Sequence, residues 1–333
     1  MKILLATDAW PPQVNGVVRT LKAMLPELDK LGHTVTTLVP DLFWTMACPF
    51  YPEIRLAFGS RRRAGAMIEE MRPDAIHIVT EGPLGFAVRR WCLERNFGFT
   101  TAYHTRFPEY LAARCAIPAR LTYGVLRNFH APARGIMVAT ESMRRALTAQ
   151  GFENLRPWGR GVDPSLFNPA LRQEDIGYKR PIFLSVGRVA MEKNLPAFLK
   201  LDLPGTKLVV GEGPQLETLK RRFPAAHFLG RVENGKLARL YASADVFVFP
   251  SRTDTFGLVL LEALASGVPV AAFPVPGPLD VIGDSGVGVL DEDLRCAALR
   301  ALDIPRERCR PYALQYTWAH CAQQFVNQLS VAG

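Results

Sequence analysis

The feature that most constrains the fold is a regular alternation of short apolar segments with longer amphipathic ones. Segments such as "KILLAT" at 2–7 and "IFLSV" at 182–186 are apolar at nearly every position, which is typical of strands buried on both faces. Stretches with helical periodicity, for example 16–31 and 83–96, lie between them. Apolar strands that alternate with helices indicate a parallel sheet covered on both sides, so we expect a doubly wound α/β fold.

The alternation occurs in two series along the chain. Predicted strands lie at 2–7, 34–39, 75–79, 99–103 and 136–139 in the first half, and at 182–186, 207–210, 226–229, 245–249 and 268–272 in the second. Two series predict two Rossmann-like domains, and 333 residues are enough for two cores. We expect an N-terminal domain over 1–163 and a C-terminal domain over 170–315, separated within the turn-rich segment 161–181. A final helix over 316–333 is expected to cross back to the first domain.

Composition limits the class of protein. With 48% hydrophobic and 21% charged residues, the chain has the composition of a folded globular protein. Its longest uncharged stretch, 263–279, is interrupted by glycines and prolines, which argues against a membrane span. The apolar run at the N-terminus is too short for a signal peptide. The six cysteines include no CxxC pair, so we expect reduced thiols, a cytoplasmic location and no bound metal.

The net charge of +9 is concentrated in the first half of the chain. Residues 1–170 contain 21 Lys and Arg against 14 Asp and Glu, whereas residues 171–333 contain 19 against 17. This excess favours an anionic partner for the first half: a phosphate, a nucleic acid or a lipid surface. The sequence has no RRM, KH or helix-turn-helix pattern, so a nucleic-acid-binding protein without enzymatic activity is a remote alternative.

Candidate ligand contacts follow the predicted strands, because ligands of open α/β sheets bind beyond the carboxyl ends of the strands. We therefore expect the site in a cleft between the two domains. After the first strand, Asn15 and Gly16 open a helix whose first N–H groups favour an anion, and Gly16 allows close approach. The alternative is that Asn15 is an ordinary N-cap. No GxGxxG motif follows a strand, which disfavours a nicotinamide or flavin cofactor.

Three further strand ends carry polar side chains. Arg188 and Lys193, in "SVGRVAMEKN" at 185–194, can direct two cations at a diphosphate; the alternative is a pair of solvated surface cations. Main-chain groups near Arg231 and Val232 can bind a base edge. His104 follows the strand at 99–103 and is a candidate site residue by position, although a lone histidine is commonly structural.

The segment "SRTDTFGLVLLEALASGVPV", residues 251–270, places two acids around a predicted helix start. If the helix begins near Gly257, its N–H groups favour a phosphate. Asp254 can then accept hydrogen bonds from sugar hydroxyls, and Glu262 from a ribose diol. The alternatives are an acid that stabilises the helix dipole for Asp254 and a buried salt bridge for Glu262.

A basic segment at 106–134 is a candidate acceptor or membrane surface. It contains Arg106, Arg120 and Arg127, and Leu121, Val125 and Phe129 form an apolar row at four-residue spacing. Such a helix can lie on an anionic membrane and admit a lipid alcohol. The alternative is an ordinary helix whose apolar row faces its own sheet.

Several of these motifs, in this order, resemble those of the retaining glycosyltransferase family 4, which has the GT-B fold. They are "PPQVNGVVRTL", "HTRFPEY", "GRVAMEKN", "GEGP", "LGRVENGKLARLYASADVFVFPS" and "TDTFGLVLLEALASGVPV", the last carrying the family's two acids, and together they span almost the whole chain. "HTRFPEY" and the "DTFG" form are similar to the branch with sulfoquinovosyl-, glucuronosyl- and glucosyl-diacylglycerol synthases and lipid mannosyltransferases. Most of the family has Glu where this chain has Asp254, so the sugar cannot be inferred.

The resemblance implies a role for each matching residue. Gly16 meets the donor phosphate through its backbone, and His104 approaches the sugar near its C6 oxygen. Arg188 and Lys193 neutralise the leaving diphosphate, and Glu262 binds the ribose. Asp254 holds the sugar and phosphate together with main-chain groups of Thr255, Phe256, Gly257 and Leu258. Arg231 and Val232 are the remaining donor-binding residues. Asn15 is assigned to the acceptor side.

The expected activity is transfer of a hexose or hexuronic acid, with retention and without a metal, from a UDP- or GDP-sugar to a hydroxyl acceptor. The acceptor is expected to be a membrane lipid such as diacylglycerol, with the enzyme peripheral at the inner face of an anionic membrane. The alternative within the same class is transfer to a soluble or polysaccharide-precursor acceptor.

Overall fold

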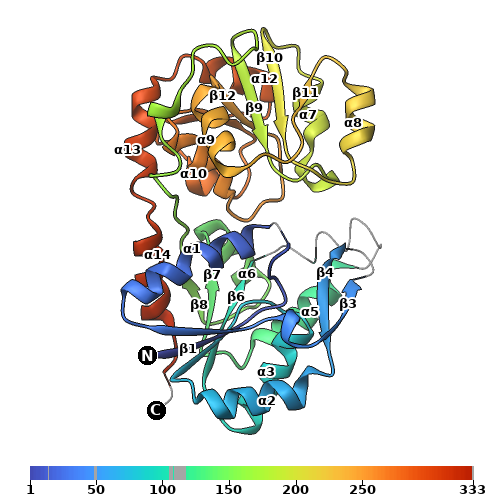
Figure 1. Ribbon diagram of the computed structural model, residues 1–333, viewed down its shortest axis with the longest axis vertical. Coiled ribbons are helices and arrows are strands. Elements are labelled where there is room, and N and C mark those ends of the chain that lie inside the picture. The colour runs from blue at the N-terminus through green and yellow to red at the C-terminus, as the bar shows by residue number, and fades with distance from the viewer. Residues whose placement is uncertain (14, 49–50, 105–107, 109–117, 332–333) are drawn as a thin grey trace. The chain divides into compact units, whose positions relative to one another are not determined.

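The computed structural model describes residues 1–13, 15–48, 51–104, 108 and 118–331. The chain divides into two compact units (Figure 1). Unit 1 comprises Met1–Arg160 with Trp318–Gly333, and unit 2 comprises Gly161–Thr317. The last helix therefore belongs to unit 1. Arg106 lies outside the described residues.

Unit 1 is built on a six-stranded parallel sheet in the order β2-β1-β5-β6-β7-β8. Its strands are β1 (Lys2–Ala6), β2 (Thr34–Leu38), β5 (Ala75–Ile78), β6 (Phe99–Tyr103), β7 (Gly135–Val138) and β8 (Leu155–Pro157). A separate antiparallel hairpin, β3 (Trp44–Cys48) and β4 (Tyr51–Phe58), is inserted after β2.

Helices cover both faces of this sheet, because successive residues of its strands point to opposite sides. Leu4 and Ile76 join the core formed with α2, α3, α5 and α6, whereas Ile3 and Ala75 join the core formed with α1 and α14. The helices are α1 (Gly16–Lys30), α2 (Ser60–Met71), α3 (Pro83–Glu94), α5 (Ala119–His130), α6 (Glu141–Ala149) and α14 (Trp318–Gln328), with a 3-10 turn, η1 (Pro40–Leu42).

Unit 2 contains a second six-stranded parallel sheet, in the order β11-β10-β9-β12-β13-β14. Its strands are β9 (Ile182–Val186), β10 (Thr206–Val210), β11 (His227–Phe228), β12 (Val246–Phe249), β13 (Val270–Ala272) and β14 (Gly288–Leu290). The helices are α7 (Leu195–Leu199), α8 (Leu216–Arg222), α9 (Asn234–Ser243), α10 (Leu258–Ala265), α11 (Pro278–Val281), α12 (Leu294–Ala301) and α13 (Cys309–Ala313), with 3-10 turns η2 (Pro169–Leu171), η3 (Met191–Lys193) and η4 (Arg306–Arg308).

The two parallel sheets confirm the predicted doubly wound α/β class. Each of the ten predicted strands overlaps an observed one, with ends that differ by up to two residues. The prediction missed β3, β4, β8 and β14. Three-residue edge strands such as β14 carry too little pattern to be recognised, and the β3–β4 hairpin interrupts the alternation with helices. No helix in the described part of the chain combines the length and apolar character needed to cross a membrane.

The strand orders determine where each sheet can bind a ligand. In both sheets the order reverses beside the first strand: between β1 and β5 in unit 1, and between β9 and β12 in unit 2. At such a switch point the loops after the two neighbouring strands run in opposite directions and leave a crevice at their carboxyl ends. The loops after β9 and β12 therefore border the expected ligand crevice of unit 2.

Candidate functional site

The switch point of unit 2 is formed by two loops that are linked through side chains. Lys193, at the end of η3 after β9, forms an ion pair with Asp254, in the loop after β12. Asn194 donates from Nδ2 to the carbonyl of Pro250 at 3.1 Å, and Ser251 donates from Oγ to the carbonyl of Glu192 at 3.1 Å. These contacts hold a cation and a carboxylate together at the edge of the sheet.

Neither charge of this pair is a solvated surface group. The side chains of Lys193 and Asp254 retain 28% and 17% of their exposure. Lys193 is thus a half-buried partner of an ion pair and not a fully solvated cation, and Asp254 is its carboxylate partner ahead of the start of α10. Arg188, two residues after β9, is half-buried in the same loop.

Glu262 lies on α10, which follows the Asp254 loop. Its side chain is buried, with 4% exposure, and its Oε2 accepts a hydrogen bond from the Tyr241 hydroxyl at 3.0 Å. The sequence offered no signal for this partner, since Tyr241 lies on α9 within an ordinary amphipathic pattern. Tyr241 packs against Phe247 of β12, which fixes the hydroxyl that orients the carboxylate.

The start of α10 requires a glycine. Gly257 precedes the helix with φ +86°, and a Cβ there would lie 3.0 Å from Leu260 and 3.3 Å from Phe249. The helix begins at Leu258, as the sequence analysis expected from Gly257. Thr255 and Phe256 connect Asp254 to this helix start, where main-chain N–H groups favour an anion.

The remaining loops at this edge are tied together by backbone hydrogen bonds. Val189 N–H donates to the Glu212 carbonyl at 2.8 Å, and Gly211 N–H donates to the Gly230 carbonyl at 2.8 Å. A Cβ at Gly211 would lie 1.8 Å from the Gly187 carbonyl oxygen, so the glycines of "GEGP" allow the loops after β9 and β10 to touch. Gly230 in turn places Arg231 and Val232 directly beyond β11.

In unit 1, the structure assigns Asn15 the role of N-cap. Its Oδ1 accepts a hydrogen bond from the Val18 N–H at 3.0 Å, as the alternative interpretation expected. Gly16 is the first residue of α1, and a Cβ there would meet no atom within 4 Å. The protein itself therefore does not require glycine at this position.

Asp8, which the sequence analysis did not single out, occupies the switch point of unit 1. Its carboxylate accepts hydrogen bonds from the N–H groups of Leu84 at 3.1 Å and Gly85 at 3.4 Å, at the start of α3. Thr80, after β5, donates to Asp8 Oδ2 at 3.2 Å. Burial raises the pKa of Asp8 to about 6, against the effect of these bonds. Its position after β1 was the available signal.

His104 directly follows β6 and is half-buried. Arg160 Nη2 lies 3.1 Å from His104 Nδ1, and the imidazole contacts the Trp158 ring edge-on at 5.5 Å. Burial is the largest cause that holds the pKa of His104 well below its ordinary value, and the charge of Arg160 adds to it. His104 is therefore a neutral side chain.

The predicted apolar row on α5 is buried at one position and exposed at two. Phe129 is buried in the core of unit 1, whereas Leu121 and Val125 retain 58% and 59% of their exposure. Arg120 is exposed, and Arg127 donates from Nη1 to the Gln150 carbonyl at 2.9 Å, at the end of α6. This helix thus presents two large apolar side chains to solvent close to Arg120.

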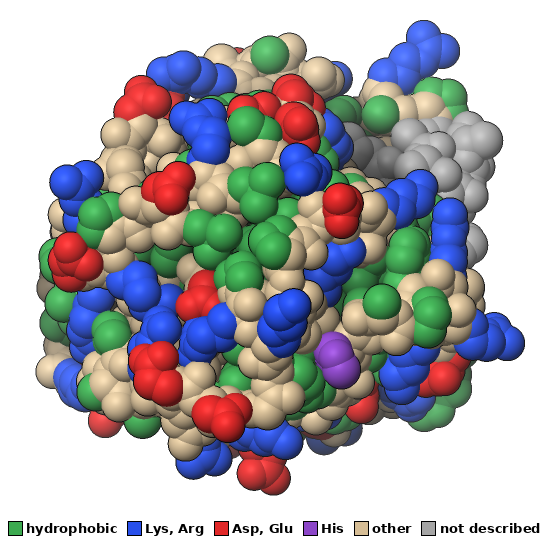
Figure 2. All heavy atoms as spheres, turned by 90° about the horizontal axis from the view of Figure 1, so that it is seen from above, with side chains coloured by type: hydrophobic (Ala, Val, Ile, Leu, Met, Phe, Trp, Pro, Cys, Tyr) green, Lys and Arg blue, Asp and Glu red, His purple; other side chains and the backbone are tan. Residues whose placement is uncertain are grey.

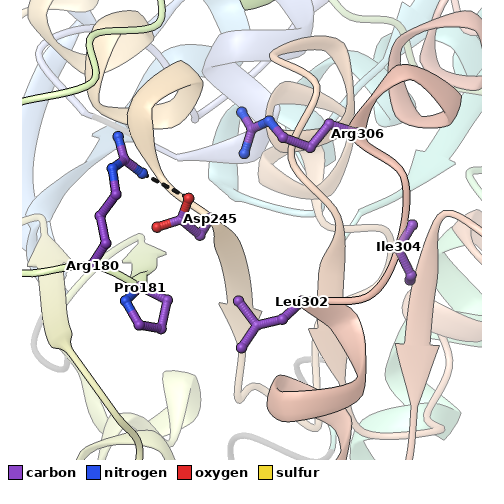
Figure 3. Close-up of a pocket in the computed structure, with 6 residues that line it drawn as sticks. All are labelled: Arg180, Pro181, Asp245, Leu302, Ile304 and Arg306. Atoms are coloured by element: carbon purple, nitrogen blue, oxygen red, sulfur yellow. Dashed lines mark hydrogen bonds and ion pairs between the residues drawn. The ribbon is translucent and has the colours of Figure 1, made fainter.

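A pocket of about 360 Å³ in unit 2 lies at the opposite edge of the sheet (Figure 3). Arg180 and Pro181 precede β9, and Asp245 precedes β12, so the pocket is at the amino ends of these strands. Arg180 donates to Asp245 Oδ1 at 2.7 Å, and the Ile182 N–H donates to Asp245 Oδ2 at 2.7 Å. These bonds hold the sheet edge together. The other lining residues are Leu302, Ile304 and Arg306.

Charges of both signs lie side by side on the surface. On the face that Figure 2 shows, Lys and Arg are interspersed with Asp and Glu. Among the side chains that the structure describes, no group of three or more His, Cys, Asp or Glu is placed to hold a metal ion.

Two Rossmann-type sheets in series, with a lysine–carboxylate pair and a helix start at the switch point of the second, are typical of proteins that bind a nucleotide there. Two family models match the chain: "Glycosyltransferase Family 4" over residues 14–166 and "Glycosyl transferases group 1" over residues 169–299. The chain belongs to glycosyltransferase family 4. It is a glycosyltransferase that uses a nucleotide sugar.

Sequence relatives come from several branches of the family. The sulfoquinovosyl transferase SQD2 of Arabidopsis thaliana is 30% identical over 83% of this chain, which spans 60% of that protein. A GDP-mannose-dependent alpha-mannosyltransferase of Mycobacterium tuberculosis is 28% identical over 87% of this chain and 83% of its own length. An alpha-monoglucosyldiacylglycerol synthase of Streptococcus pneumoniae is 29% identical over 91% and 78%.

Solved structures share the fold at lower identity. Sucrose-phosphate synthase from Thermosynechococcus elongatus matches with a TM-score of 0.78 at 20% identity, covering 98% of this chain and 97% of that one. The Anabaena protein HepE, in complex with UDP and glucose, matches with a TM-score of 0.72 at 16% identity, covering 98% of both chains. These matches confirm the GT-B fold expected from the sequence.

Proposed function

We propose that this enzyme transfers a hexose or hexuronic acid, with retention of configuration, from a UDP- or GDP-sugar to a hydroxyl of a membrane lipid such as diacylglycerol. The observation that carries the donor half is the Lys193–Asp254 pair at the switch point of unit 2, with Glu262 buried on the following helix. The acceptor half is supported by the relatives and by the exposed surface of α5.

The donor is held through its diphosphate in this proposal. The bond between the sugar C1 and the diphosphate breaks, and negative charge develops on the leaving phosphate. Lys193 and Arg188 neutralise that charge, and the N–H groups at the start of α10 add their dipole. Because these groups belong to loops already tied together, they need little reorganisation during the reaction.

The other contacts fix the two ends of the donor. Glu262, oriented by Tyr241, accepts hydrogen bonds from the ribose hydroxyls. Asp254, held by Lys193, accepts from a sugar hydroxyl, while the main chain of Thr255, Phe256, Gly257 and Leu258 lines the phosphate and sugar. Arg231 and Val232 face the base. Gly16 and His104 of unit 1 are proposed to meet the donor phosphate and the sugar near its C6 oxygen.

The acceptor hydroxyl attacks C1 on the face from which the diphosphate leaves, as the family resemblance implies. Its proton passes to the departing phosphate oxygen, so the new glycosidic bond forms without a covalent enzyme intermediate. Asn15 lies on the acceptor side. No step assigns a nucleophilic role to a carboxylate of this chain.

A lipid acceptor is favoured by two observations. A relative aligned over 91% of this chain is described as a monoglucosyldiacylglycerol synthase. In addition, Leu121 and Val125 are exposed on α5 beside Arg120, a combination suited to peripheral contact with an anionic membrane.

Two measurements test the proposal in order. Thermal unfolding with UDP, GDP and their sugars identifies the donor, because a ligand that binds only the folded state raises the midpoint. Turnover of that donor with diacylglycerol in mixed micelles then tests the acceptor. We expect nucleotide release with labelled sugar extracted into organic solvent. Product that remains in water would favour the soluble acceptor, and no nucleotide release with any donor would refute the proposal.

A further inference from the structure

Arg160 is a buried cation with an unusual set of partners. It lies three residues beyond β8 and retains 7% of its exposure. Its Nη1 donates to the carbonyls of Trp158 at 2.7 Å and Gly159 at 2.8 Å, and its guanidinium lies over the Trp158 ring at 4.5 Å. Its Nη2 is directed at His104 Nδ1, at 3.1 Å.

A guanidinium offers donors only, and this dictates the protonation of the imidazole. Because Arg160 has no lone pair to accept with, His104 Nδ1 must be the acceptor in the 3.1 Å contact. A neutral imidazole carries a single proton, which is therefore on Nε2. We propose that Arg160 is a positioning residue that holds His104 in its Nε2–H tautomer, so that His104 serves the donor sugar as a neutral hydrogen-bond donor.

The surroundings of His104 oppose a second proton. Among the residues that the structure describes, the charged or titratable groups that act on it are Arg160 from the loop after β8, His77 from β5 and His130 from α5, and none of these three is an acid. His77 is itself buried, and burial lowers its pKa to about 3. A proton on His104 Nδ1 would point at a guanidinium, so burial and charge both disfavour the imidazolium.

The loop that carries Arg160 is fixed from two sides. The Trp158 N–H donates to the Val138 carbonyl of β7 at 2.8 Å, and the Gly159 N–H donates to Gln324 Oε1 of α14 at 2.7 Å. Trp158 is fully buried and contacts His77, His104 and Phe325. The guanidinium is thus presented at a defined place, as a residue that orients another must be.

This inference rests on the proposed role of His104 at the donor sugar. It specifies that His104 donates a hydrogen bond to the sugar through its Nε2–H group. A sugar hydroxyl oxygen can accept the Nε2 proton, whereas a neutral Nε2 without a proton could only accept from the sugar. His104 therefore acts neither as a general base nor as a cation in the transfer. Its contribution is a fixed hydrogen bond whose strength is independent of pH across the range in which an ordinary histidine titrates.

The direct test is nitrogen NMR of the full chain labelled with ¹⁵N-histidine, with the His104→Gln variant used only to assign the signals. We expect His104 to show a protonated Nε2 and an unprotonated Nδ1, without change between pH 5 and 8. A protonated Nδ1, or a titration within that range, would overturn the proposal. This readout requires no donor or acceptor, so it remains valid if the proposed transferase activity is wrong.

Two variants test the link to Arg160. In Arg160→Met we expect both tautomers and a His104 pKa shifted upward toward its ordinary range. We expect kcat to fall by about 10- to 100-fold, the loss typical when a partner that orients a metal-binding histidine is removed. Arg160→Lys, which keeps a cationic donor, is expected to restore the Nε2–H signal and part of kcat. An Arg160→Met protein with an unchanged tautomer would contradict the assignment, and the wild-type spectrum decides the matter if that variant fails to fold.

Discussion

Lys193 and Asp254 form an ion pair although 61 residues separate them in the chain. The pair exists because the strand order of unit 2 places β9 beside β12, so that the loops after these two strands meet. Each residue limits the motion of the other. In the proposed function this held cation meets the diphosphate of the donor, which is the physical basis of the predictions for that site.

Replacing Lys193 by methionine is expected to lower kcat by about 10²- to 10³-fold, since one preorganised charge contact to a leaving group contributes about 2.7–4 kcal/mol to the barrier. Lys193→Arg keeps the positive charge and is expected to retain more activity. Nucleotide release at saturating donor measures the difference. An unchanged kcat in a correctly folded Lys193→Met protein would contradict the proposed role.

Glu262→Gln is expected to weaken nucleotide binding by about 10- to 100-fold, because hydrogen bonds to a charged group contribute about 1.5–3 kcal/mol. Tyr241→Phe is the matched control, since it removes the 3.0 Å bond to the carboxylate but leaves the charge in place. It is expected to reduce stability by about 1 kcal/mol with a smaller effect on binding. Calorimetric titration with UDP and GDP compares the two, and equal losses of affinity would refute the ribose assignment.

Gly16→Ala tests whether the glycine at this position is needed for donor binding or for the stability of the fold. A Cβ at this position meets no atom within 4 Å, and Ala is the better helix former, so the thermal midpoint should not fall. If the donor phosphate approaches the Gly16 backbone, the methyl group lowers donor affinity. Gly124→Ala on α5, where a Cβ is also unobstructed, is the control that should leave donor affinity unchanged. A fully active Gly16→Ala protein would remove Gly16 from the donor site.

The double variant Leu121→Ser with Val125→Ser tests the membrane surface of α5. We expect binding to vesicles that contain phosphatidylglycerol to fall at least about tenfold, because two apolar side chains no longer enter the interface. Leu93→Ser, at an exposed leucine of α3, provides the control. Co-sedimentation measures both variants, and equal binding of all three proteins would exclude α5 as the contact.

Asp8 gives the stability of the protein a defined pH dependence. Its folded-state pKa is about 6, above the ordinary 3.8, so the folded protein holds a proton that the unfolded chain releases first. The associated stability is fully present below pH 3.8 and is lost as the pH rises to about 6. A shift of this size corresponds to about 3 kcal/mol.

Asp8→Asn removes this titration and can still accept a hydrogen bond from Leu84. We therefore expect the wild-type free energy of unfolding, relative to Asp8→Asn, to decrease between pH 4 and pH 6.5 and then to stay level. Urea unfolding of both proteins at several pH values provides the measurement. A difference that increases with pH would show that the hydrogen bonds at the start of α3 outweigh the burial of the carboxyl group.

Much of the switch point of unit 2 could be inferred from local patterns. Gly257 was recognised as a helix start, and Lys193 and Asp254 as strand-end residues, because these features are short-range. Asp8, Arg160 and Tyr241 were missed, since their importance comes from partners 76, 56 and 21 residues away. The three residues of the expected apolar row on α5 do not share one environment, because the packing of unit 1 covers Phe129 and leaves Leu121 and Val125 in solvent.

The sequence by itself determined that the chain forms two doubly wound α/β halves, since hydrophobic periodicity is a local property that specifies strands, helices and their alternation. It also determined which side chains follow the strands. Only the tertiary structure decided which of those side chains meet. Strand order brings Lys193 to Asp254, the burial of α10 gives Glu262 its tyrosine partner, and the packing around Trp158 sets Arg160 against His104. Such pairings depend on long-range contacts, which a local pattern cannot encode.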